Sequence, residues 1–267
     1  MRWKLRPRSS NIIDNRRFGR KTIGGGLGFI GLAILVGLMG GDPTYLLQEG
    51  VVRTIESYSY DEKLSEPEQQ ELADFVAVVL GETESVWQQR FEQEGLDYPE
   101  PQLVLFSGST ESACGYASAA IGPFYCPLNQ RIYIDLNFFY ELKTAHGAPG
   151  DFAQAYVIAH EVGHHIQNVS GLLNSSRRRS NDESVKTELM ADCFAGVWAH
   201  DTKNLLEDGD IQEALNAASQ IGDDRLQEQS QGYVVPDSFT HGTSAQRYEW
   251  FQRGYETGSM EACNTFK

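Results

Sequence analysis

The sequence has 267 residues, of which 40% are hydrophobic and 22% charged, proportions typical of a globular protein with a substantial core. Its formal net charge of −15 is unevenly distributed, because eight of the 22 basic residues lie among the first 21 positions and the rest of the chain carries a net charge of −22. Such an acidic body argues against nucleic-acid binding, which needs a basic surface. A solvated acidic surface explains the charge most simply, and a preference for cationic substrates is the alternative.

An apolar segment follows the basic N-terminus. Residues 23–41 contain the uncharged run IGGGLGFIGLAILVGLM, and about 17 to 25 such residues suffice to cross a bilayer as a helix. We therefore predict a basic cytoplasmic tail over residues 1–22, a transmembrane anchor over 23–41, a tether over 42–64 and a folded domain over 65–267.

The direction of this anchor is predicted from its flanking charges. Because basic residues stay in the cytoplasm, the N-terminus should lie inside and everything after Asp42 outside. A cleaved signal peptide is the competing interpretation, but its basic region would be unusually long and no small-x-small cleavage site stands out before Asp42. Gly24 and Gly28 form one small-xxx-small pair, which is a weak indication of a homodimer through the anchor.

The folded domain is predicted to begin with a long helix. Ser65 is a suitable N-cap, Pro67 suits the first turn, and apolar residues then recur at helical spacing as far as Phe91. Gly95 ends this helix. Two short strands are expected next, at residues 103–106 and 131–136. Further helices are expected at roughly 151–170, 182–203, 208–220 and 243–257. A small sheet followed by many helices indicates an α+β fold, mostly helical.

Four cysteines lie in the predicted external domain. An even number in an exported domain suggests two disulfides. We favour pairing Cys114 with Cys126 and Cys193 with Cys263, although two other pairings are open and four buried free thiols are the alternative. None of the four shows the short CxxC spacing of a zinc knot.

One helical segment carries a metal-binding pattern, His160-Glu161-Val162-Gly163-His164. Residues four apart share one face of a helix, so the two imidazoles can bind a single zinc ion. Glu161 beside them can take a proton from a zinc-bound water and deliver it to a leaving amine. The alternative is a pair of surface histidines on a helix.

A catalytic zinc ion usually takes a third protein ligand. The metzincin pattern needs Gly at position 167 and His at 170, but the chain has Gln167 and Ser170. Glu188 and Asp192 are again four residues apart, in an otherwise apolar helix where unpartnered acids are costly to bury. We assign Glu188 as the third ligand and expect Asp192 to hydrogen-bond the far nitrogen of a zinc histidine. An ordinary exposed helix face is the alternative for these two acids.

The chain resembles the bacterial neutral zinc metallopeptidase family of single-span membrane proteins. The resemblance covers nearly the whole chain and rests on the basic N-terminus with its apolar segment, CGYASAAIGPFYCP, YIDLNFF, HEVGHHIQN, ELMADCFAGVWA and HGTSAQRYEWFQRGYETG. It implies a zincin-like domain at the outer face of the bacterial inner membrane, with zinc as cofactor. A peptide or protein substrate follows from the predicted peptidase function, and the resemblance identifies no particular substrate. The implied ligands are His160, His164 and Glu188, with Glu161 as base and Asp192 as the supporting acid of the glutamate-zincin pattern.

Related zincins also place a histidine downstream of the third ligand, where it stabilises the oxyanion of the reaction. His241 is our candidate for that role and Arg247 a weaker second, while a structural turn histidine is the alternative. Thr243 or Ser244 would cap the helix that follows. His165, about 100° around the helix from His164, is expected to be a packing or surface residue.

The function predicted from these residues is a membrane-anchored zinc metallopeptidase, an endopeptidase rather than an exopeptidase. An extended peptide is expected to pair with residues 132–136 as an edge strand. A membrane-tethered scaffold that binds zinc for stability is the alternative, but a structural zinc site would not need Glu161. A zinc hydrolase acting on an amide outside peptides, such as a cell-wall cross-link, is a third hypothesis.

Overall fold

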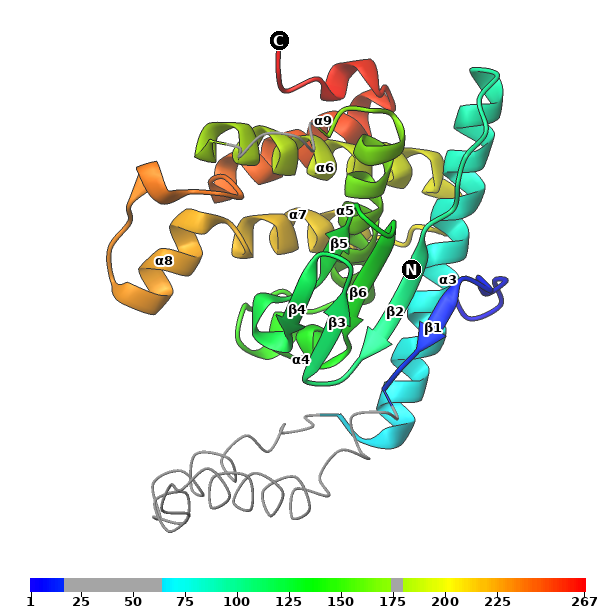
Figure 1. Ribbon diagram of the computed structural model, residues 1–267, viewed down its shortest axis with the longest axis horizontal. Helices are drawn as coiled ribbons and strands as arrows, with labels where there is room; N and C mark the ends of the chain where they lie inside the picture. The colour runs from blue at the N-terminus through cyan, green and yellow to red at the C-terminus, as the bar shows by residue number, and fades with distance from the viewer. Residues whose placement is uncertain (17–63, 174–179) are drawn as a thin grey trace, which may run out of the picture.

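The computed structural model describes residues 1–16, 64–173 and 180–267 (Figure 1). Its strands are β1 (Ile12–Asp14), β2 (Gln102–Phe106), β3 (Ser109–Ser112), β4 (Gly115–Ser118), β5 (Phe124–Cys126) and β6 (Arg131–Asp135). Its α-helices are α3 (Glu66–Gln93), α4 (Asn137–Thr144), α5 (Asp151–Val169), α6 (Asn181–Asp201), α7 (Asp210–Gln220), α8 (Asp223–Gln231) and α9 (Ser244–Thr257). The predicted α+β class is confirmed, and the predicted long helices agree with the observed ones to within about two residues.

The long helix α3 forms for the reasons visible in its sequence. The Glu68 side chain accepts the backbone N–H of Ser65, the N-cap, at 2.9 Å, and a proline lies in the first turn. In its apolar stripe, Val76, Leu80 and Trp87 are each 1% exposed or less. This helix therefore supplies one wall of the core, against which the sheet and α5 pack.

The sheet has the order β1-β2-β6-β5, with the first three strands parallel and β5 antiparallel to β6. The expectation that residues 132–136 form an edge strand is wrong, because β6 pairs with β2 on one side and with β5 on the other. The strand β5 lies between the two strands expected from the sequence and was not itself expected. It forms the edge of the sheet beside α5.

Both predicted disulfides are present, Cys114–Cys126 and Cys193–Cys263. The second joins α6 to the turn after α9, where the two helices cross very closely. A Cβ atom built on Gly254 would collide with the backbone oxygen of Cys193. Glycine at this crossing therefore lets the backbones of α6 and α9 touch.

The N-terminal residues are part of this domain. Strand β1 adds to the sheet beside β2, and the Met1 side chain is 6% exposed. The prediction of a separate tail over residues 1–22 is thus wrong for residues 1–16. The predicted anchor over 23–41 and nearly all of the tether lie outside the described residues. Within the part of the chain that the structure describes, no helix is long and apolar enough to cross a membrane.

Candidate metal centre

The predicted metal-binding pattern lies on α5, a helix that is buried along most of its length. His160 and Glu161 are each 6% exposed, and the ring centroids of His160 and His164 are 4.8 Å apart. One turn of helix separates the two imidazoles, so both face the same side, as the spacing predicts.

The third predicted ligand comes from α6, which crosses α5 at Gly163. A Cβ atom at Gly163 would lie 2.8 Å from the backbone oxygen of Ala191, so a glycine at this position allows the close approach. As a result, the Glu188 Oε2 atom lies 3.1 Å from His160 Nε2 and 3.4 Å from His164 Nε2. The ligand atoms of the three residues all lie within 4.8 Å of one another. Two imidazole nitrogens and one carboxylate are a donor set that fits zinc.

Each histidine is held by a hydrogen bond at its other nitrogen. His160 Nδ1 lies 2.7 Å from Asp192 Oδ1, as predicted, and His164 Nδ1 lies 3.0 Å from Gln167 Oε1. Because a carboxylate and an amide oxygen only accept, each Nδ1 carries the proton and each Nε2 is left for a metal. The Gln167 amide in turn donates to the Thr187 carbonyl at 2.6 Å. This role of Gln167 was missed, although its spacing of three residues from His164 could have suggested it.

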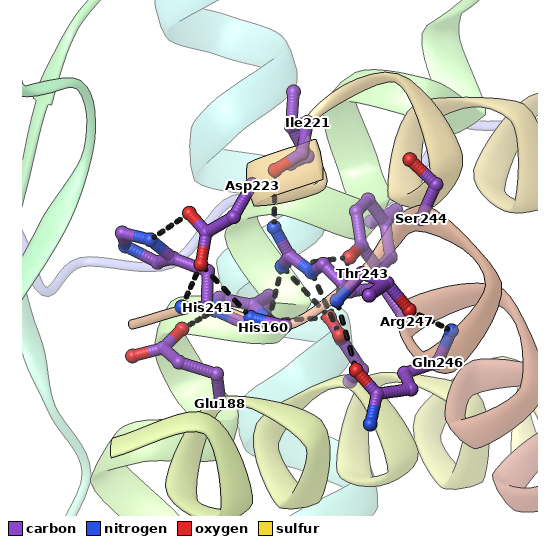
Figure 2. A network of polar contacts seen from close by, with 12 residues as sticks. His160, Glu188, Ile221, Asp223, His241, Thr243, Ser244, Gln246 and Arg247 are labelled. Atoms are coloured by element: carbon purple, nitrogen blue, oxygen red, sulfur yellow. Dashed lines mark hydrogen bonds and ion pairs between the residues drawn. The ribbon is translucent and has the colours of Figure 1, made fainter. Parts of the chain in front are cut away.

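Arg247 is the centre of a buried polar network that includes His160 and the Ile221 carbonyl (Figure 2). Asp192 belongs to the same network through its hydrogen bonds with Arg247. The guanidinium donates from Nε to Asp192 Oδ2 at 2.9 Å and from Nη2 to Asp192 Oδ1 at 3.0 Å. It also donates to the Ile221 carbonyl at 3.1 Å, and the Tyr156 hydroxyl donates to Asp192 at 2.5 Å. Arg247 is 3% exposed and its donors are directed at these groups. The geometry thus assigns Arg247 to the support of Asp192 and does not favour the oxyanion role.

Burial and neighbouring charges act in opposite directions on the acids of the site. Burial alone would raise the pKa of Asp192, but Arg247 and His160 outweigh it and lower that pKa to about 2. Burial likewise opposes ionisation of Glu188, whose pKa the two histidines hold well below its usual range. For Glu161, burial prevails over the histidines and raises the pKa. A carboxyl group with a raised pKa is suited to take up and release a proton.

His241 lies on the loop between α8 and α9 and lines the same cavity as His160 and Glu188. Its Nδ1 atom lies 3.1 Å from Asp223 Oδ1, and its backbone N–H donates to Asp223 Oδ2 at 2.6 Å. Thr243 is the N-cap of α9, since its hydroxyl accepts the Gln246 N–H at 3.1 Å. The predicted histidine is therefore placed at the site, oriented by an acid that sequence reasoning missed.

The edge strand β5 is tied to α5 by a buried hydrogen-bond cluster. The Tyr125 hydroxyl lies 3.0 Å from His165 Nδ1 and accepts from Asn168 Nδ2 at 2.9 Å, and His165 Nε2 donates to the Pro99 carbonyl. His165 is fully buried, so of the two alternatives left open it is a packing residue, and burial lowers its pKa to about 4, so the ring stays neutral. The cluster holds β5 beside the helix that carries the metal pattern.

A cavity of about 580 Å³ lies between β5 and the metal centre. Its floor holds the three candidate ligands and Glu161, and its walls include apolar side chains of Phe124, Phe138, Val157 and Leu226. A volume of this size with a few convergent polar groups is typical of a substrate site.

The comparisons with known proteins agree with this geometry. Residues 1–266 match the model of the family described as "putative neutral zinc metallopeptidase". The chain is 46% identical over 287 residues to the uncharacterized protein YpfJ of Escherichia coli (strain K12), covering 100% of this chain and 99% of that protein. It is 44% identical over 185 residues to the uncharacterized protein Rv2575 of Mycobacterium tuberculosis (strain ATCC 25618 / H37Rv), covering 63% of each. No solved structure was found to match. The chain belongs to the family of neutral zinc metallopeptidases.

Proposed function

We propose that this protein is a zinc-dependent endopeptidase whose metal is held by His160, His164 and Glu188. The observation that carries the proposal is the convergence of these three side chains at the floor of a cavity, with Glu161 buried beside them. A zinc ion held there would polarise the substrate carbonyl and lower the pKa of a water molecule to near 7.

Glu161 is the proposed general base. Its raised pKa suits a carboxylate that takes a proton from the attacking water and passes it to the leaving nitrogen. His241 is the proposed stabiliser of the negative charge that develops on the carbonyl oxygen. Because Asp223 binds the Nδ1 side of its ring, Nε2 is the nitrogen available to donate when the ring is protonated.

The strand β5 is the proposed docking edge for the substrate backbone. Among the described residues it pairs with β6 on one side only, so an extended peptide can add to its other edge by main-chain hydrogen bonds. Pairing along a strand engages the middle of a chain rather than its terminus, which favours endopeptidase activity. Membrane attachment through residues 23–41 remains part of the proposal on sequence grounds.

The test compares the full chain with its Glu161→Gln variant, because residues 1–16 belong to the fold and a protein truncated before residue 42 would lack them. We expect both forms to bind one zinc ion by elemental analysis and only the parent to cleave an unfolded protein substrate. Cleavage by the variant at the parent rate would refute Glu161 as base. A parent that binds no zinc would refute the ligand assignment, and two zinc-loaded but inactive forms would favour the scaffold alternative.

A further inference from the structure

The Met1 amino group is bound inside the domain. The Met1 ammonium donates to Asp151 at 3.0 Å, to Glu207 at 2.8 Å and to Asp210 at 3.2 Å. Asp151 and Asp210 are the first residues of α5 and α7, where carboxylates are favoured by the helix dipole. The ammonium is thus the cation that this acidic cluster holds, and it lies at the start of the helix that carries the metal pattern.

Residues 1–16 are here called the N-terminal arm. Two arginines of this arm are paired with acidic side chains of the domain. Arg6 makes two hydrogen bonds to Glu82, at 2.7 and 2.8 Å, and Arg8 donates to Asp74 at 2.9 Å. Both acids lie on α3. These two arginines are among the eight basic residues whose charge predicts a cytoplasmic tail in the sequence. The structure gives their charge a second explanation, as the complement of an acidic helix.

The arm also joins the sheet and the core. Ile12, Ile13 and Asp14 of β1 lie in parallel register with β2, and the Trp3 ring packs edge-on against Phe75 with centroids 5.3 Å apart. The Ser9 backbone N–H donates to the Ala77 carbonyl at 2.9 Å. Such contacts need the arm and the domain in one aqueous compartment, because a bilayer core about 30 Å thick would otherwise lie between the paired strands.

From these contacts we infer that the N-terminal arm and residues 64–267 lie on the same side of the membrane. A single crossing by the apolar residues 23–41 would put them on opposite sides, so this inference replaces the predicted topology of N-terminus inside and domain outside. The two disulfides are typical of an oxidising compartment. The arm is therefore expected outside the cytoplasm together with the domain.

The test measures the accessibility of one introduced thiol at a time in the full chain. Leu5 is fully exposed in the arm and Leu96 is 59% exposed in the domain, so Leu5→Cys and Leu96→Cys leave the core intact. The native cysteines are paired in disulfides, and the unsubstituted chain gives the background. Intact bacterial cells are treated with a membrane-impermeant maleimide, and the labelled fraction is compared with that in permeabilised cells.

We expect the same labelled fraction for both variants in intact cells, close to that in permeabilised cells. Equal protection of both until permeabilisation would also support the shared compartment, but would place it in the cytoplasm. Labelling of Leu96→Cys in intact cells while Leu5→Cys reacts only after permeabilisation would overturn the inference and restore the single-crossing topology. A cytoplasmic protein with a free thiol, probed in parallel, reports whether the cells are intact.

Discussion

Asp192 is a fully buried carboxylate that accepts hydrogen bonds from His160, Tyr156 and Arg247. A charge in such a place is stable only when it is paired and its lone pairs are used, which these three partners achieve. Asp192 contacts His160 at Nδ1, whereas Glu188 contacts it at Nε2, so any effect of Asp192 on a bound metal would pass through the imidazole. Arg247 donates hydrogen bonds to Asp192 and keeps this carboxylate ionised by lowering its pKa.

This arrangement predicts the effect of Asp192→Asn. A neutral amide can no longer polarise His160, so zinc affinity should fall by about 10–100-fold. Competition with a chelator of known affinity measures the change. Asp224→Asn is the matched control, since Asp224 accepts from Ser244 and lies outside the network of Asp192. A folded Asp192→Asn variant that binds zinc as tightly as the parent would contradict the assignment.

A second prediction at this scale concerns His241. If its imidazole stabilises the developing oxyanion, His241→Ala should lower kcat by about 10²–10³-fold. Zinc binding should be unchanged, because His241 is not among the three ligands. His146→Ala removes another imidazole from the wall of the same cavity and should leave kcat near the parent value. Equal kcat values for the His241→Ala variant and the parent would show that His241 is a structural turn residue.

At the scale of elements, the metal centre depends on how closely α5 and α6 approach. The ligands come from two helices, and Gly163 within the metal-binding pattern is the residue at which the helices touch. The pattern predicts the two histidines on one face, but the position of Glu188 opposite them is a property of this crossing.

Gly163→Ala should therefore weaken the site without changing a ligand. The added Cβ would lie 2.8 Å from the Ala191 oxygen, and such overpacking costs about 1–3 kcal/mol of stability. Because the helices must separate, zinc affinity should fall as well as the melting temperature. Val79→Ala on α3 is a control for stability alone, since it leaves a cavity away from the crossing. If the Gly163→Ala variant loses stability but keeps the zinc affinity of the Val79→Ala variant, the crossing does not set the ligand geometry.

At the scale of the whole molecule, the Met1 ammonium of the arm is hydrogen-bonded to the first residues of two helices, α5 and α7, which begin 150 and more residues later. Burial opposes the charge of the Met1 ammonium, but hydrogen bonds from it to Glu207 and Asp151 outweigh this and raise its pKa from 8.0 to about 10. A raised pKa means that the folded state holds this proton more tightly than the unfolded state.

The stability that comes from this group is fully present below pH 8 and is lost as the pH rises towards 10. The melting temperature of the parent should fall over this range by more than that of an Asp210→Asn variant, which has a weaker ammonium site. The lysine and tyrosine residues are the same in both proteins, so the difference between the two changes in melting temperature reports the contribution of Met1. If the melting temperatures of the two proteins fall by the same amount between pH 8 and 10, the Met1 ammonium contributes nothing to the pH dependence of stability.

Local chemistry made much of this protein predictable from its sequence. Helical periodicity places His160 and His164 on one face, the N-cap Ser65 and the long apolar stripe mark α3, and the excess of acids in an apolar helix indicates Glu188 and Asp192. These signals come from residues within one or two helical turns of each other, where the geometry of the α-helix alone determines which side chains meet.

The tertiary structure alone decided the rest. A three-residue strand such as β5 has no periodic signal, so only its pairing with β6 reveals the edge of the sheet. Asp223 and Arg247 acquire their partners across 18 and 55 residues of chain, and Met1 reaches Asp151 across 150. The basic N-terminus has the composition of a cytoplasmic tail, yet Arg6 and Arg8 are paired with acids of α3. Contacts so distant in sequence depend on the packing of the whole chain, and no local pattern encodes them.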